Sequence, residues 1–161
     1  MDIVNPEASK IILGSYPGKL SNGIGEYYSH PTNKIWELLN IPVKDENGNM
    51  LSYSEKVKAL KAKDIGLWDV VNFCERFDNK GNETSADKDI KNQEYNDFSI
   101  LQDKELYFNG MLAWLLFKKE VEDKHLPFDL NKLKNNILPS SSGAYARDHK
   151  KREDAWSAIF N

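Results

Sequence analysis

Two short runs of almost wholly apolar residues constrain the fold of this chain more than any other feature of its sequence. Lys10–Gly14 reads KIILG, and Ile65–Val71 reads IGLWDVV. Runs that are apolar at successive positions suit strands covered on both faces, as strands in a parallel sheet are. We therefore expect both runs to be buried parallel strands.

Helical patterns alternate with the strand candidates, which also include Leu106–Gly110 and the weaker Asn136–Pro139. Ser52 and Glu55 have the spacing of a capping box, which would begin a helix at residue 53. The alternation predicts an α/β fold, a three-layer α/β/α sandwich around a short, mainly parallel four-stranded sheet. Helices are expected at residues 33–39, 53–63, 111–122 and 147–160.

A polar stretch at residues 78–96 is rich in Asn, Asp, Lys and Glu. Its composition predicts a long loop, which we interpret as an insertion or a flap and not as a linker between domains. Residues 1–161 are therefore expected to form a single domain.

The composition is typical of a globular chain. Of its 161 residues, 40% are hydrophobic and 29% are charged, which excludes disordered and collagen-like chains. The longest apolar run, residues 111–117, is far shorter than the roughly 20 residues of a membrane span. Cys74 is the single cysteine, and the N-terminus lacks the features of a signal peptide. We expect a cytoplasmic protein with no membrane partner.

The charge balance limits how the chain can contact nucleic acid. Its 22 Lys and Arg against 25 Asp and Glu give a net charge of -3, and the pI is near 5.7. A general nucleic-acid binder would be basic, so any DNA contact has to be local. The one cationic concentration is either a solvated helix face or a phosphate-contacting patch. Its members are Arg147, Lys150, Lys151 and Arg152.

Turn-forming and polar residues follow the expected strands. In a parallel α/β sheet, ligands bind beyond the carboxyl ends of the strands because loops and helix N-termini converge there. Each of these segments taken alone could be a simple turn. The segments are Ser15–Gly18, Asp69, Asn109–Gly110 and Ser140–Gly143.

Common cofactor and metal motifs are not matched. The segment from Gly14 to Lys19 has three residues between its glycines where a P-loop needs four, and no Ser or Thr follows the lysine. Gly23-Ile24-Gly25 lacks the third glycine of a dinucleotide site. Cys74 and the histidines lack the spacing of zinc ligands, so we expect neither a cofactor nor a metal.

Taken together, the strand-end segments carry a family resemblance. In chain order they are GSYPG at 14–18, YYSHPTNKIW at 27–36, GLWDV at 66–70, CER at 74–76, FNG at 108–110 and LPSSS at 138–142. Their order and approximate spacing resemble the uracil-DNA glycosylase superfamily, and within it the hypoxanthine-DNA (deoxyinosine) glycosylases. The resemblance runs from Lys10 to Trp156, which is nearly the whole chain.

The resemblance implies a monofunctional glycosylase of DNA base-excision repair. Such an enzyme flips a deaminated base out of double- or single-stranded DNA and hydrolyses its N-glycosidic bond. Hypoxanthine is the base that the resemblance implies first, and we expect a monomer. Two alternatives stay open at this point: a lesion-binding protein without turnover, and a hydrolase of free nucleosides on the same fold.

The resemblance also implies roles for individual residues. Asn33, in the His-Pro-x-Asn segment, would position the attacking water, although its spacing alone suits a helix N-cap. Tyr28 would stack on the flipped base, or it could be a core aromatic. Asp69 would accept a hydrogen bond from N1–H of hypoxanthine, or it could be a structural, ion-paired carboxylate. The remaining base-pocket candidates are Ser15, Tyr16, Pro17, Gly18 and Asn109.

The DNA-contacting candidates lie near the C-terminus and are Ser140, Ser141, Ser142, Gly143, Tyr145, Arg147, Lys150 and Lys151. Phosphate contacts of this kind position a protein on DNA without reading its sequence. Two departures from the family pattern limit the comparison. Tyr16 stands where thymine- and mismatch-specific relatives have Asn, which argues against strong uracil or thymine excision. Gly143-Ala144 stands where they have a large wedge residue, which leaves Tyr145 as a candidate wedge.

Overall fold

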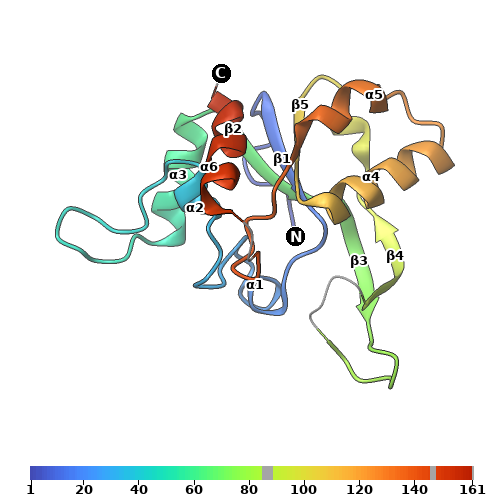
Figure 1. Ribbon diagram of the computed structural model, residues 1–161, viewed down its shortest axis with the longest axis horizontal. Coiled ribbons are helices and arrows are strands. Elements are labelled where there is room, and N and C mark those ends of the chain that lie inside the picture. Colours follow the sequence, from blue (N-terminus) through green and yellow to red (C-terminus); the bar gives the residue numbers. More distant parts are fainter. Residues whose placement is uncertain (85–88, 146–147, 161) are drawn as a thin grey trace.

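The computed structural model describes residues 1–84, 89–145 and 148–160. Its centre is a four-stranded sheet in the order β2-β1-β5-β6, in which every neighbouring pair is parallel (Figure 1). This confirms the predicted parallel sheet. The strands are β1 (Lys10–Gly14), β2 (Ile65–Asp69), β5 (Glu105–Asn109) and β6 (Ile137–Leu138).

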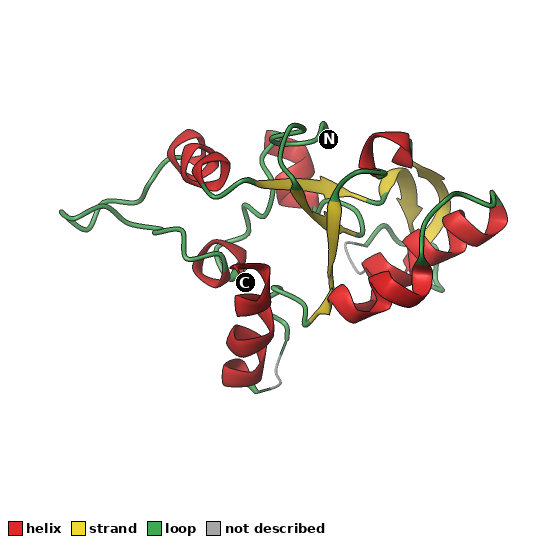
Figure 2. Cartoon of the chain, turned by 90° about the horizontal axis from the view of Figure 1, so that it is seen from above, coloured by secondary structure: helices red, strands yellow, loops and turns green. Residues whose placement is uncertain are grey.

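The helices lie on both sides of the sheet, as the view from above shows (Figure 2). The predicted three-layer sandwich is therefore confirmed. No helix within the described residues is long and apolar enough to cross a membrane. The α-helices are α1 (Lys19–Ile24), α2 (Ile35–Leu38), α3 (Tyr53–Ala62), α4 (Met111–Asp123), α5 (Leu130–Leu133) and α6 (His149–Ser157), and the 3-10 helices are η2 (Phe98–Leu101), η3 (Lys134–Asn136) and η4 (Ala158–Phe160).

Local capping explains where two of the helices begin. The Ser52 hydroxyl accepts from the Glu55 amide, and the Glu55 carboxylate accepts from the Ser52 amide at 2.8 Å, which is the predicted capping box before α3. Asp148, which interrupts the cationic run, accepts from the amides of Lys150 and Lys151 and caps α6. The expected helix start at Arg147 lies outside the described residues. No sequence signal predicted α1.

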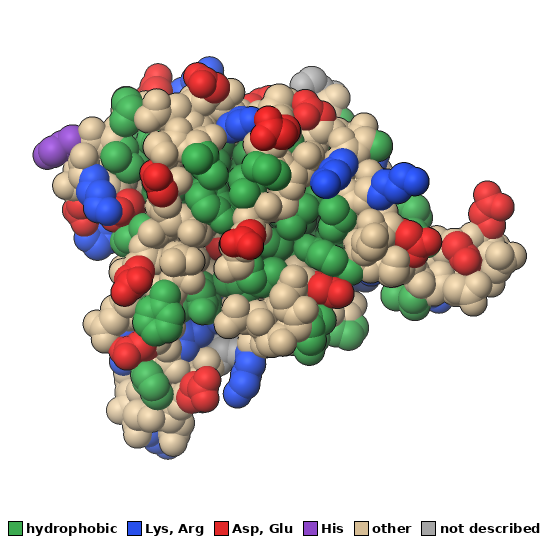
Figure 3. Space-filling model, turned by 180° about the vertical axis from the view of Figure 1, so that it is seen from behind, with side chains coloured by type: hydrophobic (Ala, Val, Ile, Leu, Met, Phe, Trp, Pro, Cys, Tyr) green, Lys and Arg blue, Asp and Glu red, His purple; other side chains and the backbone are tan. Residues whose placement is uncertain are grey.

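The prediction of a long loop over residues 78–96 is wrong for part of its length. β3 (Val71–Arg76) pairs antiparallel with β4 (Ile90–Tyr95), and the two form a hairpin that leaves the sheet directly after β2 (Figure 1). β4 has no buried residue and reads IKNQEY, so its own pattern carries no hydrophobic alternation. Pairing with β3 decides its conformation. The end of the hairpin projects from the body and carries charges of both signs, as the view from behind shows (Figure 3).

The C-terminal helix is fixed beside the last strand by one buried tryptophan. Trp156 of α6 is fully buried, and its indole N–H donates to the Pro139 carbonyl over 2.8 Å. Pro139 directly follows β6 and precedes residues 140–145, which we call the Ser loop. α6 therefore holds the start of the Ser loop at the end of the sheet.

The close approach of the chain's first residues to β2 gives a test of the sheet. A side chain on Gly66 would lie 2.6 Å from Ile11 Cδ1 and 2.8 Å from the Asn5 carbonyl. Gly66→Ala is expected to lower the free energy of unfolding by about 1–3 kcal/mol, because a methyl group there overpacks the core. Urea unfolding followed by circular dichroism measures the change.

The matched control is Gly23→Ala in α1, where an added methyl group meets nothing within 4 Å. Alanine is the better helix former by about 0.8–1.0 kcal/mol, so this variant should be at least as stable as the wild type. Equal stability of the two variants would contradict the packing described for β2.

Candidate functional site

A cavity of about 1060 Å³ opens at the carboxyl ends of the parallel strands. The segments that line it follow β1, β2, β5 and β6, together with the chain around α1 and the start of α2. The structure therefore brings the predicted segments together at one edge of the sheet. The predicted residues in the lining are Ser15, Tyr16, Pro17, Gly18, Tyr28, Asn33, Asp69, Asn109, Ser140, Ser141 and Ser142.

The floor of the cavity depends on a glycine at the end of β1. Gly14 and Asp69 are partners in the parallel register of β1 and β2. A side chain on Gly14 would collide with Asp69 Oδ1 and would lie 2.9 Å from the Tyr28 hydroxyl. Asp69 is only 4% exposed. Because Gly14 has no side chain, the Asp69 carboxylate and the Tyr28 hydroxyl can both approach the end of β1.

Tyr28 is held in an uncommon backbone conformation. Its φ of 54° lies in the left-handed region, which an aromatic residue seldom adopts. Such a conformation costs about 1–3 kcal/mol and persists only where the surroundings enforce it, as functional sites often do. The neighbouring Tyr27 ring is buried with its centroid 6.1 Å from that of Tyr28. Burial first, and then the charge of Asp69, raises the pKa of Tyr27, so this phenol stays neutral.

The loop after β1 is fixed by backbone and side-chain hydrogen bonds. The Val71 amide donates to the Ser15 carbonyl over 3.0 Å. Arg76, the last residue of β3, donates from Nη1 to the Pro17 carbonyl over 3.0 Å and from Nη2 to the Tyr16 carbonyl over 3.3 Å. Desolvation is the largest cause that raises the pKa of Tyr16, so its phenol is neutral at pH 7.

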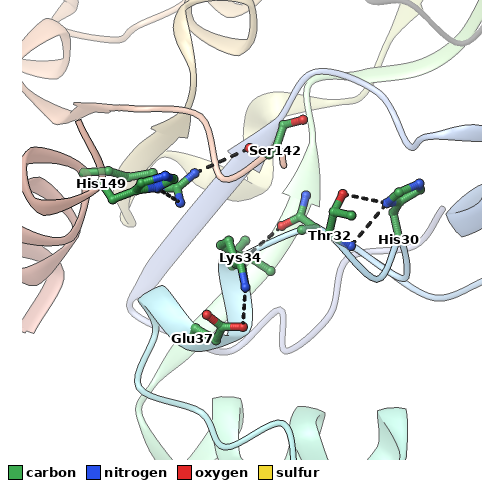
Figure 4. Close-up of polar contacts among 9 residues, drawn as sticks. His30, Thr32, Lys34, Glu37, Ser142 and His149 are labelled. Carbon is green, nitrogen blue, oxygen red and sulfur yellow. Dashed lines mark hydrogen bonds and ion pairs between the residues drawn. The ribbon is translucent and has the colours of Figure 1, made fainter. Parts of the chain in front are cut away.

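Asn33 has a structural contact in addition to its place in the cavity. Its Oδ1 accepts from the Ile35 amide, the first residue of α2, over 3.0 Å. The N-cap of α2 is Lys34, so Asn33 precedes the cap, but its carboxamide still accepts from the first amide of the helix while the residue lines the cavity. Ahead of it, the Thr32 hydroxyl lies 2.9 Å from His30 Nδ1 and fixes the turn of the His-Pro segment (Figure 4).

Both polar atoms of the Asn109 carboxamide form hydrogen bonds with the Ser loop. Its Oδ1 accepts from the Ser141 amide and its Nδ2 donates to the Ser141 hydroxyl, both over 2.8 Å. Ser141 is fully buried, and its carbonyl accepts from the Lys34 amide over 2.9 Å. These contacts join the end of β5, the Ser loop and the start of α2 into one unit. Asn109 borders the cavity mainly as the residue that positions Ser141.

Close packing explains why position 143 of the Ser loop holds no large residue. An added side chain would collide with the Thr32 side chain and would lie 2.7 Å from the Thr32 carbonyl. The Ser loop therefore packs against the His-Pro-x-Asn segment at a point where only glycine fits. Figure 4 shows Ser142 and Thr32 on these two facing segments.

Arg152 belongs to the interior and not to an exposed cationic patch. It is 4% exposed, and its guanidinium donates to the Ser142 carbonyl over 3.4 Å and lies 3.0 Å from His149 Nδ1 (Figure 4). The same group lies 5.5 Å from the Tyr145 ring centroid. The expectation that Arg152 is part of a solvated or phosphate-contacting face is therefore wrong. Lys150 and Lys151 are exposed, and Arg147 lies outside the described residues.

The sequence does not reveal that Arg76 and Arg152 are buried. Arg76 reaches carbonyls 59 and 60 residues away, and Arg152 reaches one 10 residues away. No local motif signals such contacts. Within the described part of the chain, no three or more His, Cys, Asp or Glu residues are grouped so that they could hold a metal ion.

Comparison with known proteins gives consistent matches over the whole chain. The family model of the uracil DNA glycosylase superfamily matches residues 1–161. The chain is 36% identical to the hypoxanthine DNA glycosylase of Methanosarcina barkeri and 34% identical to that of Methanosarcina acetivorans, over 98% of this chain and 94% of each relative. A solution NMR structure from Methanosarcina acetivorans, described as a proposed uracil DNA glycosylase, aligns with a TM-score of 0.70 and 32% identity. That alignment covers 99% of this chain and 94% of the other.

The contacts of Asn109 predict a stability effect. Asn109→Ala removes both hydrogen bonds to Ser141 and leaves a buried amide N–H without its acceptor, so the free energy of unfolding should fall by about 1–3 kcal/mol. Asn131→Ala, at an exposed position of α5, is the control and should stay within about 0.5 kcal/mol of the wild type. Similar denaturation midpoints for the two variants would show that the Ser loop does not depend on Asn109.

Proposed function

The chain belongs to the uracil DNA glycosylase superfamily, and we propose that it is a monofunctional DNA glycosylase that hydrolyses the N-glycosidic bond of a flipped hypoxanthine. The observation that carries the proposal is the cavity at the strand ends, lined by Asn33, Tyr28 and Asp69, in a chain 36% identical to a hypoxanthine DNA glycosylase. We further propose that residues 1–161 act as one domain and as a monomer.

Cleavage of an N-glycosidic bond develops positive charge on the sugar and negative charge on the departing base. A neutral carboxamide can orient the attacking water without acting as a strong base, which is the role proposed for Asn33. Fixed backbone N–H groups can stabilise the departing base. We propose that the backbone N–H groups around residues 15–18 do so. Arg76 binds the Tyr16 and Pro17 carbonyls of this loop and so fixes its backbone.

Recognition of the base is proposed to use three side chains around the cavity. Tyr28 provides a ring on which a flipped base can stack. The Asp69 carboxylate accepts from N1–H of hypoxanthine, a donor that adenine lacks. Tyr16 forms a neutral wall of the cavity. It stands where relatives have Asn, so this position does not offer the carboxamide that those relatives have there. The burial of Asp69 and its proximity to the Tyr28 hydroxyl at Gly14 support this assignment.

DNA binding is proposed to involve the Ser loop and the exposed start of α6. Ser140, Ser142 and the Gly143 backbone would contact phosphates beside the flipped nucleotide, and Lys150 and Lys151 would contact a neighbouring phosphate. Tyr145 would lie against the DNA at the same edge. Arg147 follows the Ser loop in sequence and is proposed as a further phosphate contact.

An alkali-cleavage assay tests the proposed activity. End-labelled duplexes carrying hypoxanthine, uracil, xanthine or mismatched thymine are incubated with the protein and a chelator and then treated with hot alkali. Scission of the hypoxanthine strand only after alkali is expected. Retention of the duplex on a gel without scission would instead indicate a lesion-binding protein, and hydrolysis of free inosine would indicate a nucleoside hydrolase.

Asn33 allows catalysis and capping to be separated. Asn33→Ala and Asn33→Ser should both lower the single-turnover rate on hypoxanthine DNA by about 100- to 1000-fold, because each removes a preorganised polar group. A serine hydroxyl can still accept from the Ile35 amide, so only Asn33→Ala should also lose about 1 kcal/mol of stability. A variant that melts lower but keeps its rate would limit Asn33 to capping. Lesion-DNA affinity, measured in parallel, should change far less than the rate.

Lys150 and Lys151 give a salt-dependence test. Changing both to Gln should weaken binding to damaged and undamaged duplex alike and flatten the plot of log K against log salt by about one to two units. The matched control changes two exposed lysines, Lys132 of α5 and Lys134 of η3; Figure 1 shows α5 well apart from α6. Equal slopes for the two double variants would leave the α6 lysines as a solvated helix face.

A further inference from the structure

The hairpin of β3 and β4 enters the function described so far only through one buried arginine, Arg76. Half of the β3 residues and all of the β4 residues are at least partly exposed, whereas Arg76, at the end of β3, is only 8% exposed. Burying a guanidinium is unfavourable unless its charge and its donors are satisfied. The partners of Arg76 therefore show what the end of β3 is fixed to: the carbonyls of Tyr16 and Pro17 in the loop after β1.

Arg76 makes three contacts with two consecutive residues of the loop after β1. Its two terminal nitrogens donate separately to the carbonyls of Tyr16 and Pro17, and its guanidinium lies 5.0 Å from the Tyr16 ring centroid. A planar fork of donors suits two neighbouring carbonyls and one aromatic face, which a lysine ammonium cannot match in the same way.

These contacts fix two features of the cavity wall. Tyr16 lines the cavity, so the guanidinium on its ring restricts where that wall can stand. The Pro17 carbonyl and the Gly18 N–H belong to one planar trans peptide, so they point in opposite directions. Holding the carbonyl on Arg76 therefore also fixes the direction of the Gly18 N–H, away from the arginine.

We propose that Arg76 is a positioning residue through which the β3–β4 hairpin sets the base specificity of the cavity, by holding Tyr16 and the loop of residues 15–18 in one arrangement. Arg76 acts through Tyr16 and the loop backbone and needs no contact with the base. The inference rests on the proposed glycosylase function. It gives the β3–β4 hairpin a role in positioning the loop after β1.

The test compares single-turnover excision of hypoxanthine and of uracil by Arg76→Lys, Tyr16→Ala and the double variant. Arg76→Lys should lower the hypoxanthine rate about 10- to 100-fold, since a small misplacement of the site costs rates of that order. Affinity for hypoxanthine duplex should stay within about threefold. The ratio of hypoxanthine to uracil rates should fall, because a mobile Tyr16 wall no longer fits the larger hypoxanthine, whereas the smaller uracil depends less on that fit.

A double-mutant cycle shows whether Arg76 works through Tyr16. In the Tyr16→Ala background, Arg76→Lys should leave the ratio of the two rates unchanged, since the ring on which it acts is gone. Full additivity of the two changes in this ratio would overturn the proposal. So would a ratio and rate for Arg76→Lys that match the wild type.

Glu75→Gln is the matched control, because Glu75 precedes Arg76 on β3 and accepts from Asn92 of β4 over 2.6 Å. It perturbs the hairpin without touching the loop, so both rates should stay at wild-type values. A change in selectivity equal to that of Arg76→Lys would attribute the effect to the hairpin as a whole and overturn the role of Arg76. If Arg76→Lys does not fold, Arg76→Gln replaces it, since its amide can still donate to one carbonyl.

The outcomes also separate this inference from the function on which it rests. A wild-type protein that excises neither base overturns the proposed function and the inference together. A wild-type protein that excises hypoxanthine, with an Arg76 variant that keeps both its rate and its selectivity, overturns the inference alone.

Discussion

The burial of β1 on both faces is the constraint on which the rest of the structure depends. Ile11, Ile12 and Leu13 are fully buried, and β1 pairs with β2 on one edge and β5 on the other. A strand covered on both faces requires helices on both sides of the sheet, and parallel neighbours place their carboxyl ends at one edge. The cavity lies where it does because of this arrangement. Gly14, the last residue of the same strand, lines the cavity and has no side chain to fill the space beside Asp69.

Buried and partly buried polar side chains hold the loops at that edge, each by reaching backbone groups of another segment. Arg76 donates to two carbonyls of the loop after β1, Asn109 accepts from the Ser141 amide, and Arg152 donates to the Ser142 carbonyl. One such hydrogen bond adds only about 0.5–1.5 kcal/mol of net stability, but leaving its buried partner unsatisfied costs more. These contacts therefore define loop positions more than they stabilise the fold. A cavity that must fit one base needs walls fixed in this way.

Several residues of the candidate site serve structure and function at once. Asn33 accepts from the first amide of α2 and also lines the cavity, and Asn109 lines the cavity while its amide group holds Ser141. Such double use explains why the spacing of Asn33 alone suits a helix start, whereas the family resemblance implies a catalytic role. Glycine has a similar double use at Gly143, where close packing against Thr32 leaves no room for a large wedge residue.

The sequence by itself determined the parallel sheet, the capping box at Ser52 and the segments that line the cavity, because apolar runs and turn residues are local patterns. It also identified Tyr16, Tyr28, Asn33 and Asp69 as site candidates through the family resemblance. Only the tertiary structure decided that β4 is a strand and that Arg76 and Arg152 are buried. A polar run such as IKNQEY has the same pattern whether or not it pairs with a neighbour, and a charged residue is buried or exposed according to partners from other segments. Those contacts form only when the chain folds, so no local pattern records them.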